Sequence, residues 1–350
     1  MERFRFKQSH DVARGIFLLA FALMCSMNVA ALTFTIGSLK YITRSNTMVS
    51  ATKNGTPIGD LVIPESVEYN GTQYSVMSIE NSAFASCTGL TSVTLPNSVT
   101  TIGDRAFENC SGLTFVNIPN SVTYIGDLAF YGCSGLTSII IPNSVTSFGN
   151  SVFYNCSALT NVVIPNSMAY IPMNMFTNCS ALINIIIPNS VTSIGYQAFK
   201  GCAKLISVTI PNSVTSIAYG VFANCSRLTN ITIPNTVTNI SNFVFDGCYS
   251  LNDIYCYIEQ PLSVTEYTFY NVSKSCRLHV PIGSASAYRN TYAWKDFYII
   301  EDLTTGIVSI EDTRSAEDND VWFTLSGVRL NGKPTIPGIY IVNGKRVVVK

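Results

Sequence analysis

The residues best suited to chemistry in this chain are its cysteines, because thiolates bind metals, act as nucleophiles and form disulfides. Eight of them recur at intervals of 23 residues: Cys87, Cys110, Cys133, Cys156, Cys179, Cys202, Cys225 and Cys248. No cysteines have the CxxC spacing of zinc sites, and disulfide frameworks have irregular spacings. We therefore expect a column of buried, reduced thiols that pack like small apolar side chains. Cys256 and Cys276 lie outside the period and are the better candidates for a disulfide.

Histidine and carboxylates offer little further chemistry. His279 is the only histidine after residue 31, which excludes a histidine-based metal cluster and disfavours a Ser-His-Asp triad. Asp104 and Asp127 lie one period apart and would stack on neighbouring coils, where they could hold a cation or form a solvated edge beside Arg105. Calcium needs more oxygen ligands than this pair supplies. We expect no catalytic residue, no metal and no cofactor, and hence no enzyme.

Charge and hydropathy exclude two classes of partner. The chain has 21 basic and 21 acidic residues, so its net charge is zero, whereas nucleic-acid binding needs a basic excess. Beyond the N-terminal segment, no apolar run approaches the ~18 residues that a membrane helix requires. We therefore expect neither a nucleic-acid partner nor a transmembrane span in the mature chain.

The N-terminal segment has the three parts of a secretory signal peptide. Basic residues from Arg3 to Arg14 precede an apolar run at residues 15–25, and small residues end at Ala31. We expect cleavage after Ala31 and export to the cell surface or the extracellular medium. Cys25 leaves a lipid anchor open as an alternative, although the preceding Met is larger than lipoprotein processing usually accepts.

The 23-residue period extends well beyond the cysteines. The string IPNSVT begins at residues 118, 141, 187 and 210, with close variants at 95, 164 and 233. The alternation in LTSVTL, residues 90–95, predicts a strand that Pro96 ends. Val99, Ile102 and Phe107 are expected to return to the core.

Three polar positions of the unit have expected backbone roles. The residue before each cysteine is Ser86 in the first unit and Asn or Gly in the others, which suits left-handed backbone. The asparagines of the IPNS strings are expected to bond neighbouring coils. The Gly that follows Ile is replaced by Pro172, Ala218 and Ser241, so we expect this Gly to be a preference and not a necessity.

One 23-residue unit cannot bury its own apolar face, whereas stacked units can. The sequence therefore predicts a leucine-rich-repeat solenoid, β-rich and right-handed, with short helical turns and a small C-terminal β module. The units resemble the BspA-like leucine-rich repeats of bacterial surface proteins through the pattern I-P-x-S-V-x-x-I-G-x-x-A-F-x-x-C-x-x-L, over residues 84 to about 256. The resemblance implies binding or adhesion at a host or bacterial surface.

The expected organisation has six parts. They are a signal peptide (1–31), an N-terminal β cap with an irregular first repeat (32–83), the solenoid (84–256), a capping half-repeat with a helix (257–302), an acidic linker (303–320) and a β-strand tail (321–350). In the cap, Asn70-Gly71 predicts a hairpin.

The tail predicts three short strands. Through GIYIV and KRVVVK it resembles a shortened form of the C-terminal sorting domain of Bacteroidota type IX secretion. The alternative is a small β module that folds onto the end of the solenoid.

The outward positions of the predicted strands form the candidate binding face. Most carry small polar residues, but Ile140, Val163 and Ile186 occupy the same position in three successive units. The candidate ligand-binding residues are Phe115, Asn117, Ile140, Val163 and Ile186. Cross-strand pairing of β-branched residues is the alternative explanation, because exposed apolar patches mark interfaces only when they are large.

Three functions stay open at this stage. The first is an adhesin-like protein that binds a host or bacterial surface protein. The second is a glycan-binding module, which requires tyrosines grouped on one face, with these candidates: Tyr124, Tyr131, Tyr154, Tyr170, Tyr196 and Tyr219. The third, a surface-associated hydrolase, lacks a catalytic constellation.

Overall fold

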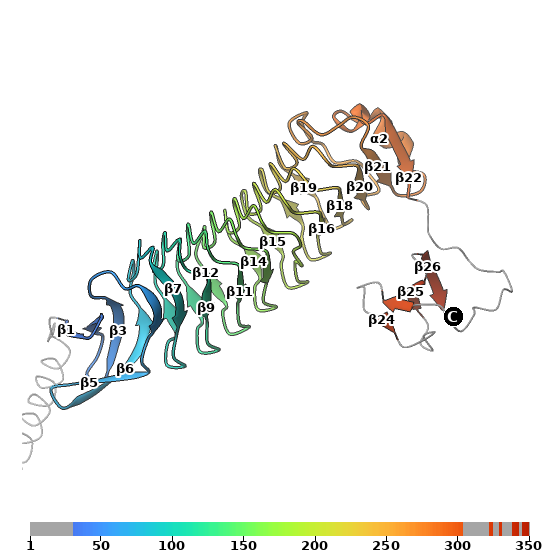
Figure 1. The fold of residues 1–350 in the computed structure, drawn as a ribbon. Helices are drawn as coiled ribbons and strands as arrows, with labels where there is room; N and C mark the ends of the chain where they lie inside the picture. The colour runs from blue at the N-terminus through green and yellow to red at the C-terminus, as the bar shows by residue number, and fades with distance from the viewer. Residues whose placement is uncertain (1–30, 304–321, 325–328, 331–337, 343–344, 350) are drawn as a thin grey trace, which may run out of the picture. The chain divides into compact units, whose positions relative to one another are not determined.

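The computed structural model describes residues 31–303, 322–324, 329–330, 338–342 and 345–349. The expected signal peptide up to residue 30, Cys25 and nearly all of the acidic linker lie outside these residues. The chain divides into two compact units, residues 1–183 (unit 1) and residues 184–350 (unit 2). Figure 1 shows the strands of both units as arrows joined by short loops.

Unit 1 begins with a β cap followed by regular coils. Strands β1, β2 and β3 are antiparallel, and β3 runs parallel to β6. The strands of unit 1 are β1 (Thr33–Ile36), β2 (Leu39–Thr43), β3 (Met48–Lys53), β4 (Gly59–Val62), β5 (Ser66–Tyr69), β6 (Thr72–Ile79), β7 (Leu90–Thr94), β8 (Thr101–Ile102), β9 (Phe115–Asn117), β10 (Tyr124–Ile125), β11 (Ser138–Ile140), β12 (Ser147–Phe148), β13 (Asn161–Val163) and β14 (Tyr170–Ile171).

The predicted hairpin of the cap is confirmed. Strands β5 and β6 pair antiparallel from Tyr69 and Thr72, so Asn70 and Gly71 form the two-residue turn. Their φ angles are 51° and 74°, the positive values that this turn type requires at both positions. The β cap therefore closes the first coil of unit 1 with a tight turn.

The coils of unit 1 place their strands in two parallel rows. One row contains β4, β7 and β9, and β11 pairs with β13 in the same register. The second row contains β6, β8, β10 and β12. Residues one period apart are partners in both rows, as Ile139 is with Val162 and Ile125 is with Phe148. The period of the sequence thus fixes the register of the sheet.

Unit 2 repeats this plan, with a short helix between its last two parallel strands, β21 and β22. One row contains β16, β18, β20, β21 and β22, all parallel, and the other contains β15, β17 and β19. The elements are β15 (Ser193–Ile194), β16 (Ser207–Thr209), β17 (Ser216–Ile217), β18 (Asn230–Ile233), β19 (Asn239–Ile240), β20 (Asp253–Cys256), β21 (Arg277–Val280), α2 (Ala285–Asn290), the 3-10 helix η1 (Trp294–Asp296) and β22 (Ile299–Asp302).

The tail of unit 2 forms four strands where three were predicted. They are β23 (Trp322–Thr324), β24 (Arg329–Leu330), β25 (Gly338–Val342) and β26 (Lys345–Val349), in the order β24-β23-β25-β26. The prediction missed the division of the first segment into β23 and β24, because a two-residue strand carries almost no alternation. The two Asn-Gly pairs of the tail, at residues 331–332 and 343–344, for which hairpins are expected, lie outside the described residues.

The core consists of columns of identical side chains. Phe84, Phe107, Phe130, Phe153 and Phe176 stack ring on ring in unit 1, with centroids 5.3 to 5.7 Å apart. A corresponding column in unit 2 contains Phe199, Phe222, Phe245 and Phe269. A buried Phe contributes ~1.5–3 kcal/mol, so the columns are a main source of stability. The predicted leucine-rich-repeat solenoid with coils of about 23 residues is confirmed.

The residues before the cysteines have the predicted left-handed backbone. Their φ angles lie between 57° and 73° at Ser86, Asn109, Gly132, Asn155, Asn178, Gly201, Asn224 and Gly247. The expected asparagine ladder is confirmed at one step, where the Asn166 backbone N–H donates to Asn143 Oδ1 at 3.1 Å. The adjacent serine also links neighbouring coils, at this step through Ser167 Oγ and the carbonyl of Val145 at 2.7 Å, whereas Ser144 Oγ and Ser190 Oγ are buried without a partner. Ser121 Oγ donates to the carbonyl of Val99 at 2.6 Å.

In three coils of unit 1 the Gly after Ile is not required by its own backbone conformation, as expected, but is confined by the preceding coil. A Cβ on Gly126 would lie 2.3 Å from Asp104 Oδ1, and Gly103 and Gly149 are equally confined. The confinement arises because an Asn or Asp of the preceding coil caps the backbone at this point. Ala218 and Ser241 follow a tyrosine in the preceding coil instead, which explains why the Gly is replaced at these two positions.

Candidate functional site

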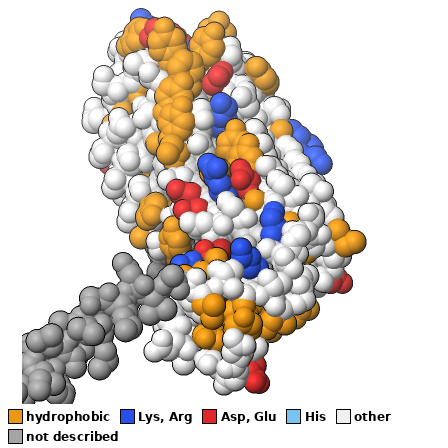
Figure 2. All heavy atoms as spheres, turned by 90° about the vertical axis from the view of Figure 1, so that its left-hand side faces the viewer, with side chains coloured by type: hydrophobic (Ala, Val, Ile, Leu, Met, Phe, Trp, Pro, Cys, Tyr) orange, Lys and Arg blue, Asp and Glu red, His pale blue; other side chains and the backbone are white. Residues whose placement is uncertain are grey.

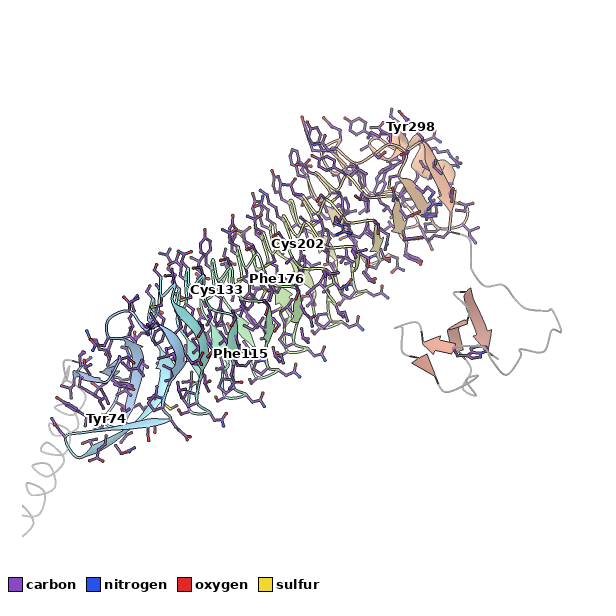
Figure 3. All side chains as sticks on the ribbon, viewed as in Figure 1. Tyr74, Phe115, Cys133, Phe176, Cys202 and Tyr298 are labelled. Atoms are coloured by element: carbon purple, nitrogen blue, oxygen red, sulfur yellow. The ribbon has the colours of Figure 1, made fainter. Side chains whose placement is uncertain are left out.

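The outward side chains of the first strand row in unit 1 are the candidate binding patch. Phe115 lies on β9, Ile140 on β11 and Val163 on β13, with 54%, 75% and 58% of their surfaces exposed. Ile140 and Val163 are register partners on adjacent strands. We call Phe115, Ile140 and Val163 the sheet patch. Phe115 is labelled in Figure 3.

The two other candidate residues are also exposed. Asn117 is exposed on β9, opposite Thr94 of β7. Ile186 belongs to unit 2 and is 83% exposed. The alternation in the sequence therefore predicted the direction of all five side chains, and their role in binding stays a prediction.

Polar, uncharged residues accompany the sheet patch on its strands. Ser138 and Asn161 are the other outward residues of β11 and β13, and both are exposed. Asp60 of β4 accepts hydrogen bonds from Ser92 Oγ at 2.6 Å and Thr91 Oγ1 at 2.8 Å, and these bonds hold the pKa of its carboxyl below the usual value. In the view of Figure 2, Lys and Arg side chains lie beside Asp and Glu side chains and form no field of one sign.

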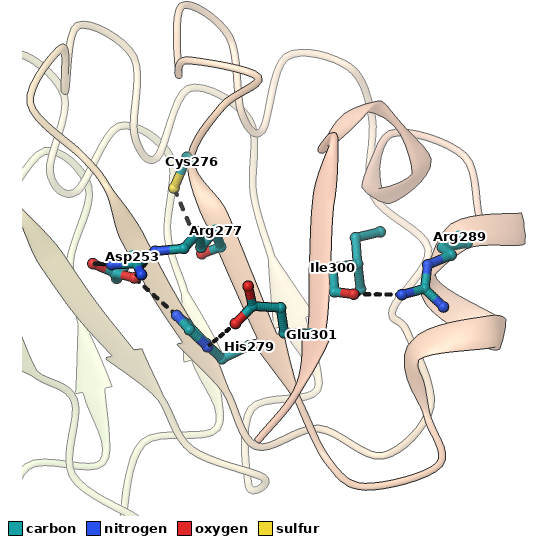
Figure 4. A network of polar contacts seen from close by, with 7 residues as sticks. All are labelled: Asp253, Cys276, Arg277, His279, Arg289, Ile300 and Glu301. Atoms are coloured by element: carbon teal, nitrogen blue, oxygen red, sulfur yellow. Dashed lines mark hydrogen bonds and ion pairs between the residues drawn. The ribbon is translucent and has the colours of Figure 1, made fainter. Parts of the chain in front are cut away.

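A polar network on the strands of unit 2 was missed by the sequence reasoning (Figure 4). Asp253 of β20 accepts from His279 Nε2 at 2.8 Å, and Arg277 of β21 pairs with the same carboxylate at 2.8 Å. The other ring nitrogen of His279 lies 3.6 Å from Glu301 of β22, and its ring stacks on Tyr255 at 4.6 Å. Burial acts to raise the pKa of the Asp253 carboxyl, but hydrogen bonds from His279 and Arg277 outweigh it and keep that pKa low.

The side chains of this network form ion pairs, and none of them is placed to act as a nucleophile. Both nitrogens of His279 face carboxylates, so neither is placed to activate a hydroxyl or thiol. The nearby thiol of Cys276 is buried, and burial raises its pKa to about 12. Among the described residues, no group of three or more His, Cys, Asp or Glu side chains is arranged to hold a metal ion.

The carboxylates of Asp104 and Asp127 accept hydrogen bonds from backbone N–H groups of the next coil. Asp104 Oδ1 accepts the backbone N–H of Asp127 at 2.9 Å, and Asp127 Oδ1 accepts that of Asn150 at 2.5 Å. Asn81 begins this series by accepting the N–H of Asp104 at 2.8 Å. The pair predicted as a solvated edge or cation site is therefore an exposed ladder of caps between coils.

The eight periodic cysteines are free and buried, as predicted. They also donate hydrogen bonds, which the sequence did not reveal. Cys133 Sγ lies 3.1 Å from the carbonyl oxygen of Phe107, and Cys156 Sγ lies 3.2 Å from that of Phe130. The Phe130 carbonyl also accepts the backbone N–H of Cys133, so both of its lone pairs are used.

The suggested disulfide of Cys256 and Cys276 is wrong, because both thiols are free and buried. Cys256 Sγ lies 3.3 Å from the hydroxyl of Tyr288, which donates to the carbonyl of Ile258 at 2.7 Å. Cys276 Sγ contacts the carbonyl of Arg277 at 3.8 Å. Each thiol thus has a polar neighbour other than the second cysteine.

The six candidate tyrosines occupy three different positions of the repeat. Tyr124 lies on β10 and Tyr170 on β14, at the same position of the repeat. Tyr131 stacks on Tyr154 at 5.1 Å in unit 1, and in unit 2 the pair of Tyr196 and Tyr219 stacks at 5.1 Å. They therefore form no single platform.

Comparison with known proteins identifies the family. A model of the BspA type leucine rich repeat region matches in six copies over residues 77–206 and 169–299, which is more than half of the chain. The chain belongs to the BspA-type leucine-rich repeat family. BspA-type proteins are typically binding proteins without enzymatic activity, and this BspA-type chain resembles bacterial cell-surface leucine-rich repeat proteins.

Solved structures of bacterial leucine-rich repeat proteins are similar to this BspA-type chain. One from T. pallidum is 27% identical, covering 63% of this chain and 91% of that chain, with a TM-score of 0.44. One from Bacteroides ovatus is 25% identical, covering 73% and 80%, with a TM-score of 0.43. A leucine rich cell surface protein from Faecalibacterium prausnitzii is 24% identical, covering 65% and 95%, with a TM-score of 0.27.

A search of the curated proteins found no match. Among the described helices, none has the length and hydropathy that a membrane span requires.

Proposed function

We propose that this protein is exported, stays at the cell surface or in the medium, and binds a host or bacterial surface protein through the sheet patch. The observation that carries the proposal is the exposure of Phe115, Ile140 and Val163 on strands whose other outward residues are polar. A few residues near the centre of an interface supply most of the binding energy, and burial of exposed apolar side chains such as these is favourable.

The charge distribution supports a protein partner bound by apolar contact. The chain is neutral overall, and the outward residues beside the patch, Ser138 and Asn161, are uncharged. Binding should therefore depend weakly on salt, since electrostatic steering contributes little. We propose a similar contact role for Ile186 of unit 2, which rests on its own exposure of 83%.

Cross-strand pairing is the competing explanation of the patch. A β-branched pair such as Ile140 with Val163 contributes ~0.2–1 kcal/mol to sheet stability. The double substitution Ile140→Thr and Val163→Thr keeps β-branching, so it should leave the unfolding midpoint nearly unchanged. A role in pairing alone predicts that this variant binds its partner as well as the wild type does.

The proposed function is tested by screening the full chain against a panel of purified host matrix and bacterial surface proteins. Wild type, the Ile140→Thr/Val163→Thr variant and a matched control, Ser138→Ala/Asn161→Ala on the same two strands, are compared. The proposal predicts at least one protein ligand that the patch variant loses and the control retains. It is wrong if no protein binds, or if the two variants bind alike.

We also propose that the tail acts as the export signal of the type IX route. The support is its sequence resemblance and its separate four-stranded sheet. Deleting residues 307–350 should leave a folded solenoid that no longer reaches the surface. Normal surface abundance of the truncated chain would refute the sorting role.

A further inference from the structure

Unit 2 carries a continuous row of aromatic rings. It consists of Tyr196, Tyr219, Phe243, Tyr267 and Tyr270, which we call the aromatic ridge. Successive centroids lie 5.1, 5.4 and 5.3 Å apart from Tyr196 to Tyr267, and Tyr270 lies 5.8 Å from Phe243. The four tyrosines are 38% to 47% exposed, so the row is a surface feature and not part of the core.

Phe243, at the centre of the ridge, has a backbone conformation that is unfavourable for a bulky side chain. Phe243 has a φ of 58°, the left-handed region that a bulky side chain rarely adopts. The equivalent residue is left-handed in the other coils as well, for example Leu128 at 58°, Gln197 at 52° and Gly220 at 63°. The repeat therefore sets this backbone conformation, and the choice of Phe at the position is what distinguishes this coil. Phe243 is only half-buried, and its ring joins Tyr219 to Tyr267 and Tyr270.

The rings of the ridge change orientation along the row. Tyr196 and Tyr219 are nearly parallel, at 6°, and cover each other's faces. From Phe243 onwards the planes are tilted, by 57° to Tyr219 and by 75° to Tyr270. Tyr267 and Tyr270 thus have no parallel neighbour within the ridge, and they are 44% and 47% exposed, so we call this the open end of the ridge.

Hydrogen-bonding groups flank the open end of the ridge. Glu266 accepts the Tyr292 hydroxyl at 2.6 Å, and Thr265 Oγ1 donates to Asn242 Oδ1 at 2.6 Å. Asn271, next to Tyr270, donates to Asp246 at 2.9 Å. The surface therefore combines aromatic faces with hydroxyl, amide and carboxylate groups.

We propose that the aromatic ridge binds a neutral polysaccharide. A pyranose ring has an apolar C–H face that packs on an aromatic ring and a rim of hydroxyls that pairs with amides and carboxylates. The charged residues named beside the open end, Glu266 and Asp246, are acidic, which disfavours phosphorylated or sulfated ligands. The phenol hydroxyls also disfavour a purely apolar ligand. Because one ring recurs in each of several coils, a polymer of sugars contacts more than one at once. This proposal is independent of the protein-binding role of the sheet patch.

The test is affinity electrophoresis of the full chain in gels that contain a β-glucan, an α-glucan, a xylan or a mannan. The key variant is Phe243→Asn, because Asn accepts left-handed backbone and the central ring is lost. We expect wild type to be retarded by at least one polysaccharide and Phe243→Asn to bind it about tenfold or more weakly. Its thermal midpoint should be unchanged or raised.

Two further variants keep the test decisive. Tyr267→Ser/Tyr270→Ser removes the exposed rings should Phe243→Asn fold poorly, and it should also lose binding. Tyr131→Ser/Tyr154→Ser removes the stacked pair of unit 1, and this variant should still bind the polysaccharide. The proposal is overturned if no polysaccharide retards the wild type, or if the ridge variants bind as wild type does. Loss of a protein ligand on Phe243→Asn, without any glycan binding, would make the ridge a protein interface and overturn it equally.

Discussion

The buried thiols of the repeats give a quantitative prediction about the fold. When the native full chain is exposed to a thiol reagent such as DTNB at pH 8, its repeat cysteines should react very slowly. Burial raises the pKa of Cys110 and Cys248 to about 12. At pH 8 roughly one such thiol in 10⁴ is ionised, against about one in four for an ordinary cysteine of pKa about 8.5. The reaction should therefore be about 2,000-fold slower from ionisation alone, and slower still because the sulfurs are enclosed.

The order in which the cysteines react follows from local charge. Burial raises the pKa of Cys87, but the charge of Lys53 offsets part of this effect, so Cys87 should react before Cys110. Stopped-flow absorbance measures the rates, and mass spectrometry of the peptides assigns them. In guanidinium without reductant, all ten cysteines after residue 31 should react at once. Rapid native labelling of the central cysteines would refute the buried column, and failure to label after denaturation would show disulfides.

The remaining predictions concern stability. The pKa values of the repeat thiols are higher in the folded chain than in the unfolded chain. Their contribution to the free energy of unfolding is therefore complete below about pH 8.5 and falls as pH rises towards 12. Each such thiol should lower this free energy by ~1.4 kcal/mol per pH unit above 8.5. Circular dichroism melts between pH 7.5 and 10 should show a falling midpoint, and a constant midpoint would contradict this. Gly126→Ala would place a Cβ 2.6 Å from the Asp104 backbone N, so it should lower the free energy of unfolding in urea by ~1–3 kcal/mol. The control Ala218→Gly should change this free energy little, and equal effects of the two substitutions would refute the confinement of Gly126. Asp253→Asn should lower the free energy of unfolding by ~1–2 kcal/mol, because it weakens the hydrogen bonds from His279 and Arg277. Asp296→Asn, in an exposed ion pair with Lys274, should lower it by less than ~0.5 kcal/mol. The reverse order of the two effects would contradict a stabilising role of the network.

The sequence predicted the features that depend on the exact period. Because Val116 lies 23 residues after Val93 and pairs with it, the repeat gave the strand register, the buried columns and the outward direction of the sheet patch. It also gave the left-handed positions, since Asn and Gly recur before the cysteines.

The sequence did not predict features that depend on a change of period or on a contact between coils. Asp253 pairs with Arg277, which is 24 residues later, and Arg277 with Ile299, which is 22 residues later, so the network does not align with the repeat. Phe243 is likewise 24 residues after Tyr219, which hid the aromatic ridge. The need for glycine at Gly126 arises from the Asp104 cap in another coil, and no single coil reveals it.

The dissociation constant for the protein ligand found in the panel of matrix and surface proteins tests the central claim most directly. It should be measured by calorimetry for wild type, Ile140→Thr/Val163→Thr and Ser138→Ala/Asn161→Ala, at two salt concentrations. We predict that the patch variant binds about tenfold or more weakly, since ~1.4 kcal/mol of buried apolar contact is lost, with the control within about twofold of wild type and little effect of salt. Unchanged affinity of the patch variant at an unchanged melting temperature would contradict the account.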